Sequence, residues 1–391
     1  MLYLKEFLFL LINSLLTVIT SFAKLDDKRI IVTSTHNSSY NFNSKYFYEF
    51  ATSESLWKDY SIYYVINDVS KRNELNDHFR TKRFISSNTL KEKLFCLSAK
   101  CWISSTFELP VNSFIINKKR IVVHLGHGVP LKKIGLNEER ITLFKRINRI
   151  IRTRQFTDIV CYSEILKDSM MKTFANEKAN YVCLGQPRND SLRMDVCEIK
   201  NRLAEISGAN SDAKFILYAP TWRPYATTVF FPFDIDIEQL NSFLKYNNIY
   251  IFFRSHPFYP SVIDENISKL DNIVQFNSII APEICDYLCA FDSLITDYSS
   301  IYIDYLTTNK PIGFIPYDLD SYIKHVGFCY DYDEFTPGMK IYNCEGLIEF
   351  LVENGSNFEN KREVIRKITN TKSTGNCLEL SKYLHERLLS Q

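Results

Sequence analysis

The sequence lacks the short motifs that mark several large classes of enzyme. It contains no Walker phosphate-binding pattern, no set of protein-kinase motifs, no nucleophile elbow and no dinucleotide-binding Gly-x-Gly-x-x-Gly. Each of these motifs places a glycine or a reactive side chain at a turn that its chemistry requires. Their absence argues against an ATPase, a hydrolase and a dehydrogenase.

The chain also has little net charge and no pattern of paired cysteines. Its formal charge is +2, with 46% hydrophobic and 24% charged residues, a balance typical of neither a disordered chain nor a polyanion-binding protein. We therefore expect no nucleic acid partner. The ten cysteines show no Cys-x-x-Cys and no Cys/His pairing at zinc spacing, which favours reduced thiols in a cytosolic protein. A length of 391 residues is enough for two domains.

Residues 1–24 carry an apolar run without charges, from Phe7 to Ala23. Polar residues recur there at helical spacing, and large apolar residues occupy the opposite side, namely Leu8, Leu11, Leu15, Ile19 and Phe22. This spacing favours a helix that lies in the plane of a membrane surface or packs on the protein itself. A signal sequence or a membrane span fits less well, because no small-residue cleavage site followed by a disulfide framework is present.

From Arg29 onwards, β-rich runs alternate with helical patterns, which predicts parallel sheets covered by helices on both faces. In the first half, strands are expected at 30–34, 61–66, 101–104, 120–125, 158–162 and 181–184. The polar stretch 190–212 is the best candidate for a boundary, and strands are then expected at 215–219, 249–254, 273–275, 294–296 and 312–315. We therefore predict an N-terminal helix at 1–24 and two doubly wound α/β domains, 25–195 and 205–391. A C-terminal amphipathic helix, 378–389, is placed to pack back across the junction.

A basic helix is expected at 138–154, where arginine and lysine recur at 140, 145, 146, 149, 152 and 154. The basic face of this helix has two interpretations. It is either simply exposed to solvent, or it contacts an anionic acceptor or lipid headgroups.

The stretch 292–318 reads as a strand, a helix and a second strand. A turn at Asp297 leads into Ser299 and Ser300, where the helix is expected to begin. Free N–H groups at the start of a helix hold phosphate in open α/β sheets, which makes this turn a candidate phosphate cradle for a nucleotide donor. An ordinary capping turn is the alternative.

His127 stands between two glycines after an expected strand. The glycines, one of them Gly128, let the backbone turn sharply and leave the imidazole uncovered. An imidazole that titrates near neutrality is the usual group for taking a proton from a hydroxyl nucleophile. Lys132 and Lys133 follow closely enough to meet a phosphate. The alternative is a structural histidine, as we expect for His124.

His256 ends a strand of the second half, two residues after Arg254. An imidazole there is placed to donate a hydrogen bond to an oxygen that gains charge. Arg188 and Arg223 follow prolines in two further turns and are candidates to stabilise the same charge.

Six motifs follow one another along the chain: 126–133 (GHGVPLKK), 186–190 (QPRND), 219–223 (APTWR), 254–257 (RSHP), 296–300 (TDYSS) and 317–320 (YDLD). Their order resembles the CDP-glycerol glycerophosphotransferase family, which includes the teichoic acid primases and polymerases. The resemblance spans residues 29–340 and includes the stretch 43–49.

The resemblance implies a GT-B fold, in which two Rossmann-like domains face a cleft, the first on the acceptor side and the second binding the nucleotide. It implies transfer of glycerol phosphate from CDP-glycerol to a hydroxyl of a lipid-linked or polymeric acceptor, of teichoic acid or capsule type, with release of CMP. CDP-glycerol is the donor substrate, and no metal or other cofactor is implied. Peripheral attachment to the inner face of the cytoplasmic membrane is implied as well.

Roles carry over by motif. His127 would be the general base and His256 would act on the transferred phosphate. The donor and its phosphates would be held by Arg188, Arg223, Arg254, Thr296, Asp297, Ser299 and Ser300. The acceptor side would include Gly128, Lys132 and Lys133.

The sequence departs from the family pattern at three positions. Gly126 and Val129 stand where a tryptophan and a threonine usually flank the His-Gly pair, and Gln186 replaces a tyrosine. These changes leave the acceptor and the alditol open, so transfer from CDP-ribitol, or a GT-B glycosyltransferase reaction with a nucleotide sugar, is the alternative. A protein without enzymatic activity, acting as a module that binds a lipid surface, is the alternative outside the enzymes. The long N-terminal extension of the polymerases is missing, which favours a compact primase-like or capsule-type enzyme.

Overall fold

The computed structural model describes residues 2–193, 195–210, 212–226, 230–254, 270–353, 355–370, 372 and 374–390. The chain divides into two compact units. Unit 1 consists of Met1–Val129, Ile134–Asp190 and Thr371–Gln391, and unit 2 consists of Pro130–Lys133 and Ser191–Asn370.

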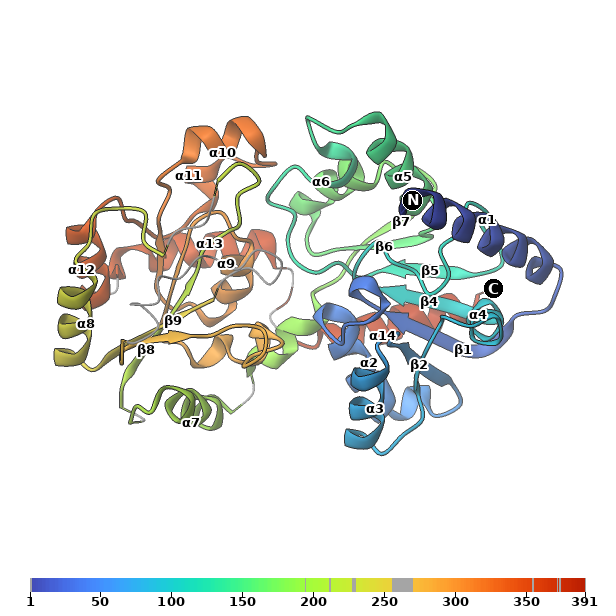
Figure 1. The fold of residues 1–391 in the computed structure, drawn as a ribbon, viewed down its shortest axis with the longest axis horizontal. Coiled ribbons are helices and arrows are strands. Elements are labelled where there is room, and N and C mark those ends of the chain that lie inside the picture. Colours follow the sequence, from blue (N-terminus) through green and yellow to red (C-terminus); the bar gives the residue numbers. More distant parts are fainter. Residues whose placement is uncertain are drawn as a thin grey trace. The chain divides into compact units, whose positions relative to one another are not determined.

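Unit 1 is built on a parallel sheet of seven strands in the order β3-β2-β1-β4-β5-β6-β7 (Figure 1). Its strands are β1 (Asp26–Thr33), β2 (Ser61–Val65), β3 (Phe84–Ile85), β4 (Ala99–Ser104), β5 (Ile121–His124), β6 (Asp158–Cys161) and β7 (Asn180–Cys183). Every residue of the central strands β4, β5 and β6 is buried, because helices cover the sheet on both faces. The order reverses direction between β1 and β4, as in doubly wound sheets.

The helices of unit 1 are α1 (Leu2–Ser21), α2 (Phe42–Ser53), α3 (Val69–His78), α4 (Leu90–Leu97), α5 (Leu143–Thr153), α6 (Glu164–Phe174) and α14 (Asn376–Leu389). Local sequence sets several of their starts. Thr89 and Glu92 form a capping box at the start of α4, and the Thr142 side chain accepts the Lys145 N–H at the start of α5. The Thr142 cap explains why α5 is shorter than the expected basic helix at 138–154.

The C-terminal helix α14 belongs to unit 1 rather than to the second domain, in contrast to the predicted division at 205–391. Its first turn is held by Asp190, whose carboxylate accepts the N–H groups of Asn376 (3.0 Å) and Cys377 (2.8 Å). Farther along, Tyr383 and Arg387 donate to the buried Asp158 at 2.5 and 3.0 Å. These polar contacts join the last helix to strand β6.

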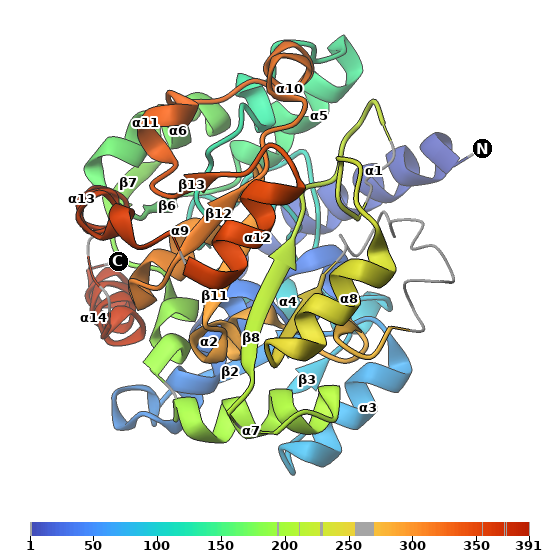
Figure 2. The ribbon, with the colours of Figure 1, turned by 90° about the vertical axis from the view of Figure 1, so that its left-hand side faces the viewer.

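Unit 2 has a parallel sheet of six strands in the order β10-β9-β8-β11-β12-β13, the same reversal pattern as in unit 1. Its strands are β8 (Lys214–Ala219), β9 (Ile249–Phe253), β10 (Ile273–Gln275), β11 (Ser293–Thr296), β12 (Ile312–Phe314) and β13 (Met339–Lys340). Its helices are α7 (Val196–Ser207), α8 (Ile237–Tyr246), α9 (Ile301–Tyr305), α10 (Leu319–His325), α11 (Tyr332–Phe335), α12 (Cys344–Glu353) and α13 (Glu359–Thr369). Helices α8 and α12 lie on one side of β8 (Figure 2).

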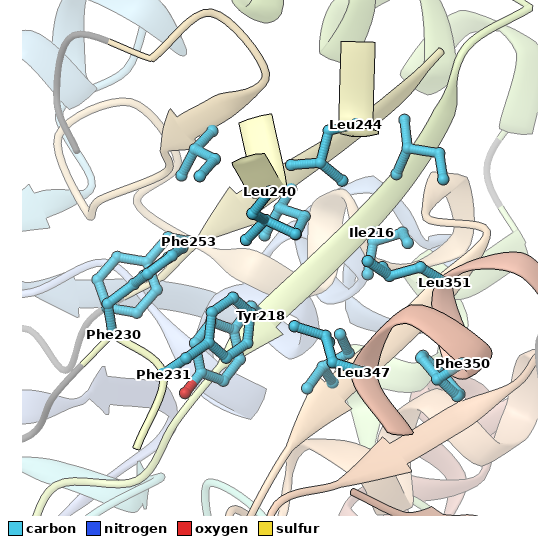
Figure 3. Packing of buried hydrophobic residues seen from close by; sticks show 14 of the residues in the cluster. Ile216, Tyr218, Phe230, Phe231, Leu240, Leu244, Phe253, Leu347, Phe350 and Leu351 are labelled. Carbon is cyan, nitrogen blue, oxygen red and sulfur yellow. The ribbon is translucent and has the colours of Figure 1, made fainter. Parts of the chain in front are cut away.

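A hydrophobic core fills the space between the unit 2 sheet and these two helices (Figure 3). Leu240 and Leu244 of α8 and Leu347 of α12 pack against alternate residues of β8. The rings of Tyr218 and Phe231 stack with their centroids 4.6 Å apart. This packing fixes the strands whose carboxyl ends carry the polar residues described below.

Helix α1 packs on unit 1 with its polar side chains. Asn13, Ser14 and Thr17 are buried, Asn13 Nδ2 donates to the Asn112 carbonyl (2.9 Å), and Ser14 Oγ accepts the Phe114 N–H (2.9 Å). The opposite side of the helix is apolar and exposed, with Leu8, Phe9, Leu11, Ile12, Leu15, Val18 and Ile19. Among the described residues, no helix has the length and apolarity that a membrane crossing requires.

Candidate functional site

In unit 1 the turn after β5 is held by Asn43, near the start of α2. Asn43 Nδ2 donates to the carbonyl oxygens of Leu125 (3.2 Å) and Gly126 (2.9 Å), and Asn43 Oδ1 accepts the Arg188 N–H (3.0 Å). Gly126 has φ +72°, and a Cβ there would lie 1.9 Å from the Tyr162 hydroxyl. Gly128 has φ +139°. Glycine at both positions therefore lets the turn place His127 at the surface of the unit.

His127 is exposed, and its ring is oriented by one hydrogen bond. Its Nδ1 lies 3.0 Å from the carbonyl oxygen of Ser105, which follows β4. A carbonyl oxygen only accepts, so Nδ1 carries the proton in the neutral ring and Nε2 keeps a lone pair. Desolvation by the surrounding protein and the nearby Arg188 charge lower the pKa of His127, while the bond to Ser105 opposes this shift. The neutral ring at physiological pH can thus accept a proton at Nε2.

Arg188, a predicted charge-stabilising residue, lies beside His127 in unit 1. Its guanidinium donates from Nη1 to the His127 carbonyl oxygen at 2.9 Å, and the side chain is buried. Asn43, which holds both the histidine turn and the Arg188 backbone, was not assigned a role from the sequence. The only hint in the sequence was that Asn43 lies in the stretch 43–49, which is part of the family resemblance.

Most of the predicted donor residues lie in unit 2, where the strand order reverses between β8 and β11: Arg223, Thr296, Asp297, Ser299 and Ser300. Arg188, which was predicted with them, lies in unit 1. Thr296 ends β11, and its hydroxyl donates to the Ala219 carbonyl at the end of β8 (2.7 Å). The Asp297 carboxylate accepts the N–H groups of Thr221 (2.8 Å) and Tyr298 (2.5 Å). Ligands of doubly wound sheets bind at such a reversal point, outside the carboxyl ends of the strands.

Arg223 is the fully buried centre of this group. Its Nη1 donates to Asp297 Oδ2 and to the Thr221 carbonyl, both at 2.5 Å, while Nε and Nη2 donate to the two oxygens of Asp318 at 3.0 and 2.8 Å. Burial alone would lower the pKa of Arg223, but the two carboxylates raise it above its ordinary value. Four hydrogen bonds within the protein hold the guanidinium, so its main effect is to fix the loops after β8, β11 and β12.

Asp318 was part of a motif, but its role as the second partner of Arg223 was not predicted. It also accepts the hydroxyl groups of Tyr225 (2.7 Å) and Tyr298 (2.9 Å). Burial would raise the pKa of Asp318, yet the bonds from Arg223 and Tyr225 keep it below its usual range. Together, Arg223, Asp297 and Asp318 form one ionic network, which we call the switch-point network.

The expected phosphate cradle has a shorter helix than predicted. Helix α9 begins at Ile301 instead of Ser299 and has five residues before a single 3-10 turn, 306–308, that ends at Asn309. Ser300 is its N-cap residue without a side-chain capping bond, and Ser299 Oγ accepts the Ile301 N–H at 3.4 Å. Both serines are half-buried and directly follow the switch-point network.

Two predicted residues of the second half remain, the donor candidate Arg254 and the catalytic candidate His256, and the structure describes only Arg254. Its Nη1 donates to the carbonyl oxygens of Phe276 (3.2 Å) and Ala281 (2.8 Å), and burial lowers its pKa. These contacts tie the end of β9 to the segment after β10. His256 lies outside the described residues.

Lys132 and Lys133 belong to unit 2, although their motif begins in unit 1. Lys132 forms an antiparallel bridge with Phe328, and the Lys133 N–H donates to the Gly327 carbonyl at 3.2 Å. The Cys329 N–H donates to the Leu131 carbonyl at 2.8 Å. The two lysines are therefore built into the unit that carries the predicted donor residues.

The two units carry different chemical groups. Unit 1 presents a neutral imidazole beside an arginine, and unit 2 presents hydroxyls and a cation at a strand-order reversal. Among the described residues, no group of three or more His, Cys, Asp or Glu side chains is arranged to hold a metal ion.

Comparison with known proteins supports a relationship over nearly the whole chain. The family described as CDP-Glycerol:Poly(glycerophosphate) glycerophosphotransferase matches residues 15–378. A teichoic acid poly(glycerol phosphate) polymerase of Bacillus spizizenii is 27% identical over 348 residues, which cover 83% of each chain. A teichoic acid poly(ribitol-phosphate) polymerase of the same organism is 32% identical over 210 residues, and the match covers 53% of this chain and only 33% of that protein.

A solved structure of the wall teichoic acid polymerase TagF shares the fold. The TM-score is 0.79 at 20% sequence identity, covering 97% of this chain and 94% of that one. Each unit thus has the Rossmann-like architecture expected of a GT-B protein. The chain belongs to the CDP-glycerol:poly(glycerophosphate) glycerophosphotransferase family.

Proposed function

We propose that this protein transfers glycerol phosphate from CDP-glycerol to a hydroxyl of a lipid-linked or polymeric acceptor of teichoic acid or capsule type, and releases CMP. Family membership supports the reaction class. The observation that carries the residue assignment is the hydrogen bond from His127 Nδ1 to the Ser105 carbonyl, which leaves Nε2 as a proton acceptor.

In the proposed reaction, His127 Nε2 takes the proton of the acceptor hydroxyl. The acceptor oxygen then forms a bond to the β-phosphorus, the phosphorus that carries glycerol. The bond from that phosphorus to the bridging oxygen breaks, and CMP leaves with the bridging oxygen and its electron pair. Positioning and charge stabilisation supply most of the rate enhancement in such transfers. Arg188 and His256 are the proposed charge-stabilising groups.

The donor is proposed to bind at the reversal point of unit 2. Thr296, Asp297, Ser299 and Ser300 border it, and the switch-point network holds their loop in place through Arg223. Arg254 is proposed to shape the donor site by fixing the end of β9. The acceptor is proposed to bind on the side of Gly128.

The direct test follows CMP release from CDP-glycerol by the purified protein with a panel of acceptors. Replacing His127 by Ala should lower the rate about 10²- to 10⁴-fold, the usual contribution of a general base, and leave CDP-glycerol affinity unchanged. His78, an exposed histidine of α3, provides the matched control because His78→Ala removes an imidazole far along the chain from the motifs. Near-normal turnover by His127→Ala would refute the assignment.

Transfer of ribitol phosphate from CDP-ribitol is the second candidate, because one of the relatives above is a poly(ribitol-phosphate) polymerase. Both reactions release CMP, but the mass added to the acceptor differs by the extra carbons of ribitol. A product that gains a sugar without phosphate would instead indicate a glycosyltransferase.

We further propose that the protein works in the cytoplasm, attached to the inner face of the membrane through α1. Helix α1 buries its polar side against the protein and exposes an apolar side, the reverse of a helix that packs on a core. Leu15 is 61% exposed and Ile19 58% exposed. Apolar side chains arranged in this way bury themselves at the boundary between headgroups and acyl chains.

Helix α5 extends the proposed lipid-facing surface. Gln155, just after α5, donates to the Ser113 carbonyl, and the neighbouring Phe114 N–H donates to Ser14 of α1, so one loop joins the two helices. Leu143 and Phe144 of α5 are exposed next to Lys145 and Arg146. Anionic headgroups favour such a mixture of apolar and basic side chains.

Flotation with vesicles that contain anionic phospholipid tests this attachment. Two lost apolar contacts should weaken partitioning by on the order of 100-fold in a Leu15→Glu, Ile19→Glu double variant. Tyr246, which is 90% exposed on α8 of unit 2, provides the control, because Tyr246→Glu adds a charge to the surface without changing α1. Equal partitioning of the double variant and the wild type would exclude α1 as the attachment site.

A further inference from the structure

The strongest unexplained feature of unit 2 is the ammonium group of Lys132. In the part of the chain that the structure describes, this group makes no hydrogen bond and no ion pair. Its Nζ lies 5.8 Å from the centroid of the Tyr322 ring, near the limit of a cation–π contact. The side chain is half-buried, so a charged group sits there without the partners that burial ordinarily requires.

The backbone around Lys132 is rigidly held. Its bridge to Phe328 is flanked by the bonds from Lys133 N–H to Gly327 and from Cys329 N–H to Leu131. The Cys329 thiol also donates to the Lys132 carbonyl at 3.3 Å. The side chain therefore starts from a fixed position on unit 2 and does not depend on the placement of unit 1.

The neighbouring charges are already satisfied by each other. Each oxygen of Asp318 accepts two hydrogen bonds, and Asp297 accepts from Arg223 and from two backbone N–H groups. Asp297 and Arg223 act on Lys132 electrostatically from this network, and the hydroxyls of Tyr225 and Tyr298 point into Asp318. Among the residues that the structure describes, none accepts the three N–H donors of the Lys132 ammonium, and these donors suit an anion from outside the protein.

We infer that Lys132 binds a phosphate of the nucleoside diphosphate donor, so that this residue serves the donor site of unit 2 and not the acceptor side. The inference rests on the proposed function, since it takes the donor to be a nucleoside diphosphate ester. The strand-order reversal between β8 and β11, where Asp297 and Arg223 lie, is the place where such a ligand binds in doubly wound sheets.

The charge state of Lys132 gives the inference a distinctive signature. Burial lowers the pKa of Lys132 to about 8, Asp297 opposes the shift and Arg223 adds to it. A bound diphosphate would favour the ammonium form and raise this pKa again. Above the lowered pKa, diphosphate binding should therefore take up a proton that the empty site lacks.

Isothermal titration of CDP-glycerol, CDP and cytidine tests the inference. Loss of a charge-assisted hydrogen bond should weaken CDP-glycerol and CDP about 10- to 100-fold in Lys132→Met and leave cytidine unaffected. Lys132→Arg keeps the charge and should restore most of the affinity. The matched control is Lys310→Met. Lys310 is another half-buried lysine of unit 2 with a lowered pKa, but it precedes β12 and donates to the Cys289 and Phe291 carbonyls.

Titration of the wild type with CDP at pH 9, in buffers of different ionisation enthalpy, measures the proton uptake without any substitution. Uptake that is present in the wild type and absent in Lys132→Met supports the inference. Unchanged CDP affinity in Lys132→Met overturns the inference, and so does a loss of cytidine affinity equal to the loss of CDP affinity. In either case, CDP-glycerol turnover by the wild type still upholds the proposed function. A wild type that binds neither CDP nor CDP-glycerol overturns both.

Discussion

Asp318 gives the sharpest prediction about stability, because replacing it by asparagine changes charge and almost nothing in shape. Its Oδ1 accepts Arg223 Nη2 and the Tyr298 hydroxyl, and its Oδ2 accepts Arg223 Nε and the Tyr225 hydroxyl. The asparagine amide N–H₂ would face two donors in either orientation. Arg223 would also lose one of its two carboxylate partners while fully buried.

Removing one partner of a buried ion pair costs about 3–5 kcal/mol of unfolding free energy. Asp297 still pairs with Arg223 in the variant, so we expect about 3 kcal/mol, at the lower end of that range. For a unit of about 150–250 residues this corresponds to a fall of about 6–12 °C in melting temperature. Thermal and urea unfolding, followed by calorimetry and circular dichroism, measure both quantities.

The pH dependence adds a second check. The pKa of Asp318 is lowered in the folded protein, so its contribution to stability is present above the unfolded value of about 4 and is lost as the pH falls through the folded value. The difference in unfolding free energy between the wild type and Asp318→Asn should be largest at pH 7 and should shrink below about pH 4.

The control is Asp320→Asn, an exposed carboxylate two residues away, which should change stability by no more than about 0.5 kcal/mol. Equal melting temperatures for Asp318→Asn and Asp320→Asn would refute the view that the switch-point network holds unit 2 together.

Three further predictions concern unit 1. Gly185→Ala places a Cβ 1.6 Å from Asn376 Oδ1, so the buried Asn376 side chain at the start of α14 must shift, and unfolding free energy should fall by about 1–3 kcal/mol in denaturant titrations. Tyr383→Phe removes one donor from the buried Asp158 and should cost about 1–3 kcal/mol by the same measurement; no change would mean that α14 is held without it. In a pH profile of kcat/KM, the fall in activity at acidic pH should have its midpoint below the ordinary imidazole pKa of about 6.5, because the pKa of His127 is lowered. A midpoint above that value would contradict the assignment of His127 as the base.

The sequence was sufficient to predict the longer strands and their parallel arrangement. Short β-rich runs such as 61–66 and 215–219 became β2 and β8, since buried parallel strands have a local signature. The two-residue edge strands β3 and β13 were not predicted, because two residues carry no periodicity.

The contacts that build the site were harder to foresee. Arg223 meets Asp297 and Asp318 across 74 and 95 positions of sequence, and no local pattern specifies such a pairing. Motif order placed these residues in one region but did not say which would bind a ligand and which would bind each other. Lys132 was assigned to the acceptor side by its motif, whereas its backbone pairs with Phe328 of unit 2.

The interleaving of the two units has a consequence for anyone who wishes to study them apart. The chain passes from one unit to the other after Val129, Lys133, Asp190 and Asn370. A fragment that stops at Asp190 lacks the helix that binds Asp158, and a fragment from Ser191 to Asn370 lacks the segment that pairs with residues 327–329. Neither half can therefore be obtained intact by a single cut, and separate expression requires a permuted or spliced gene.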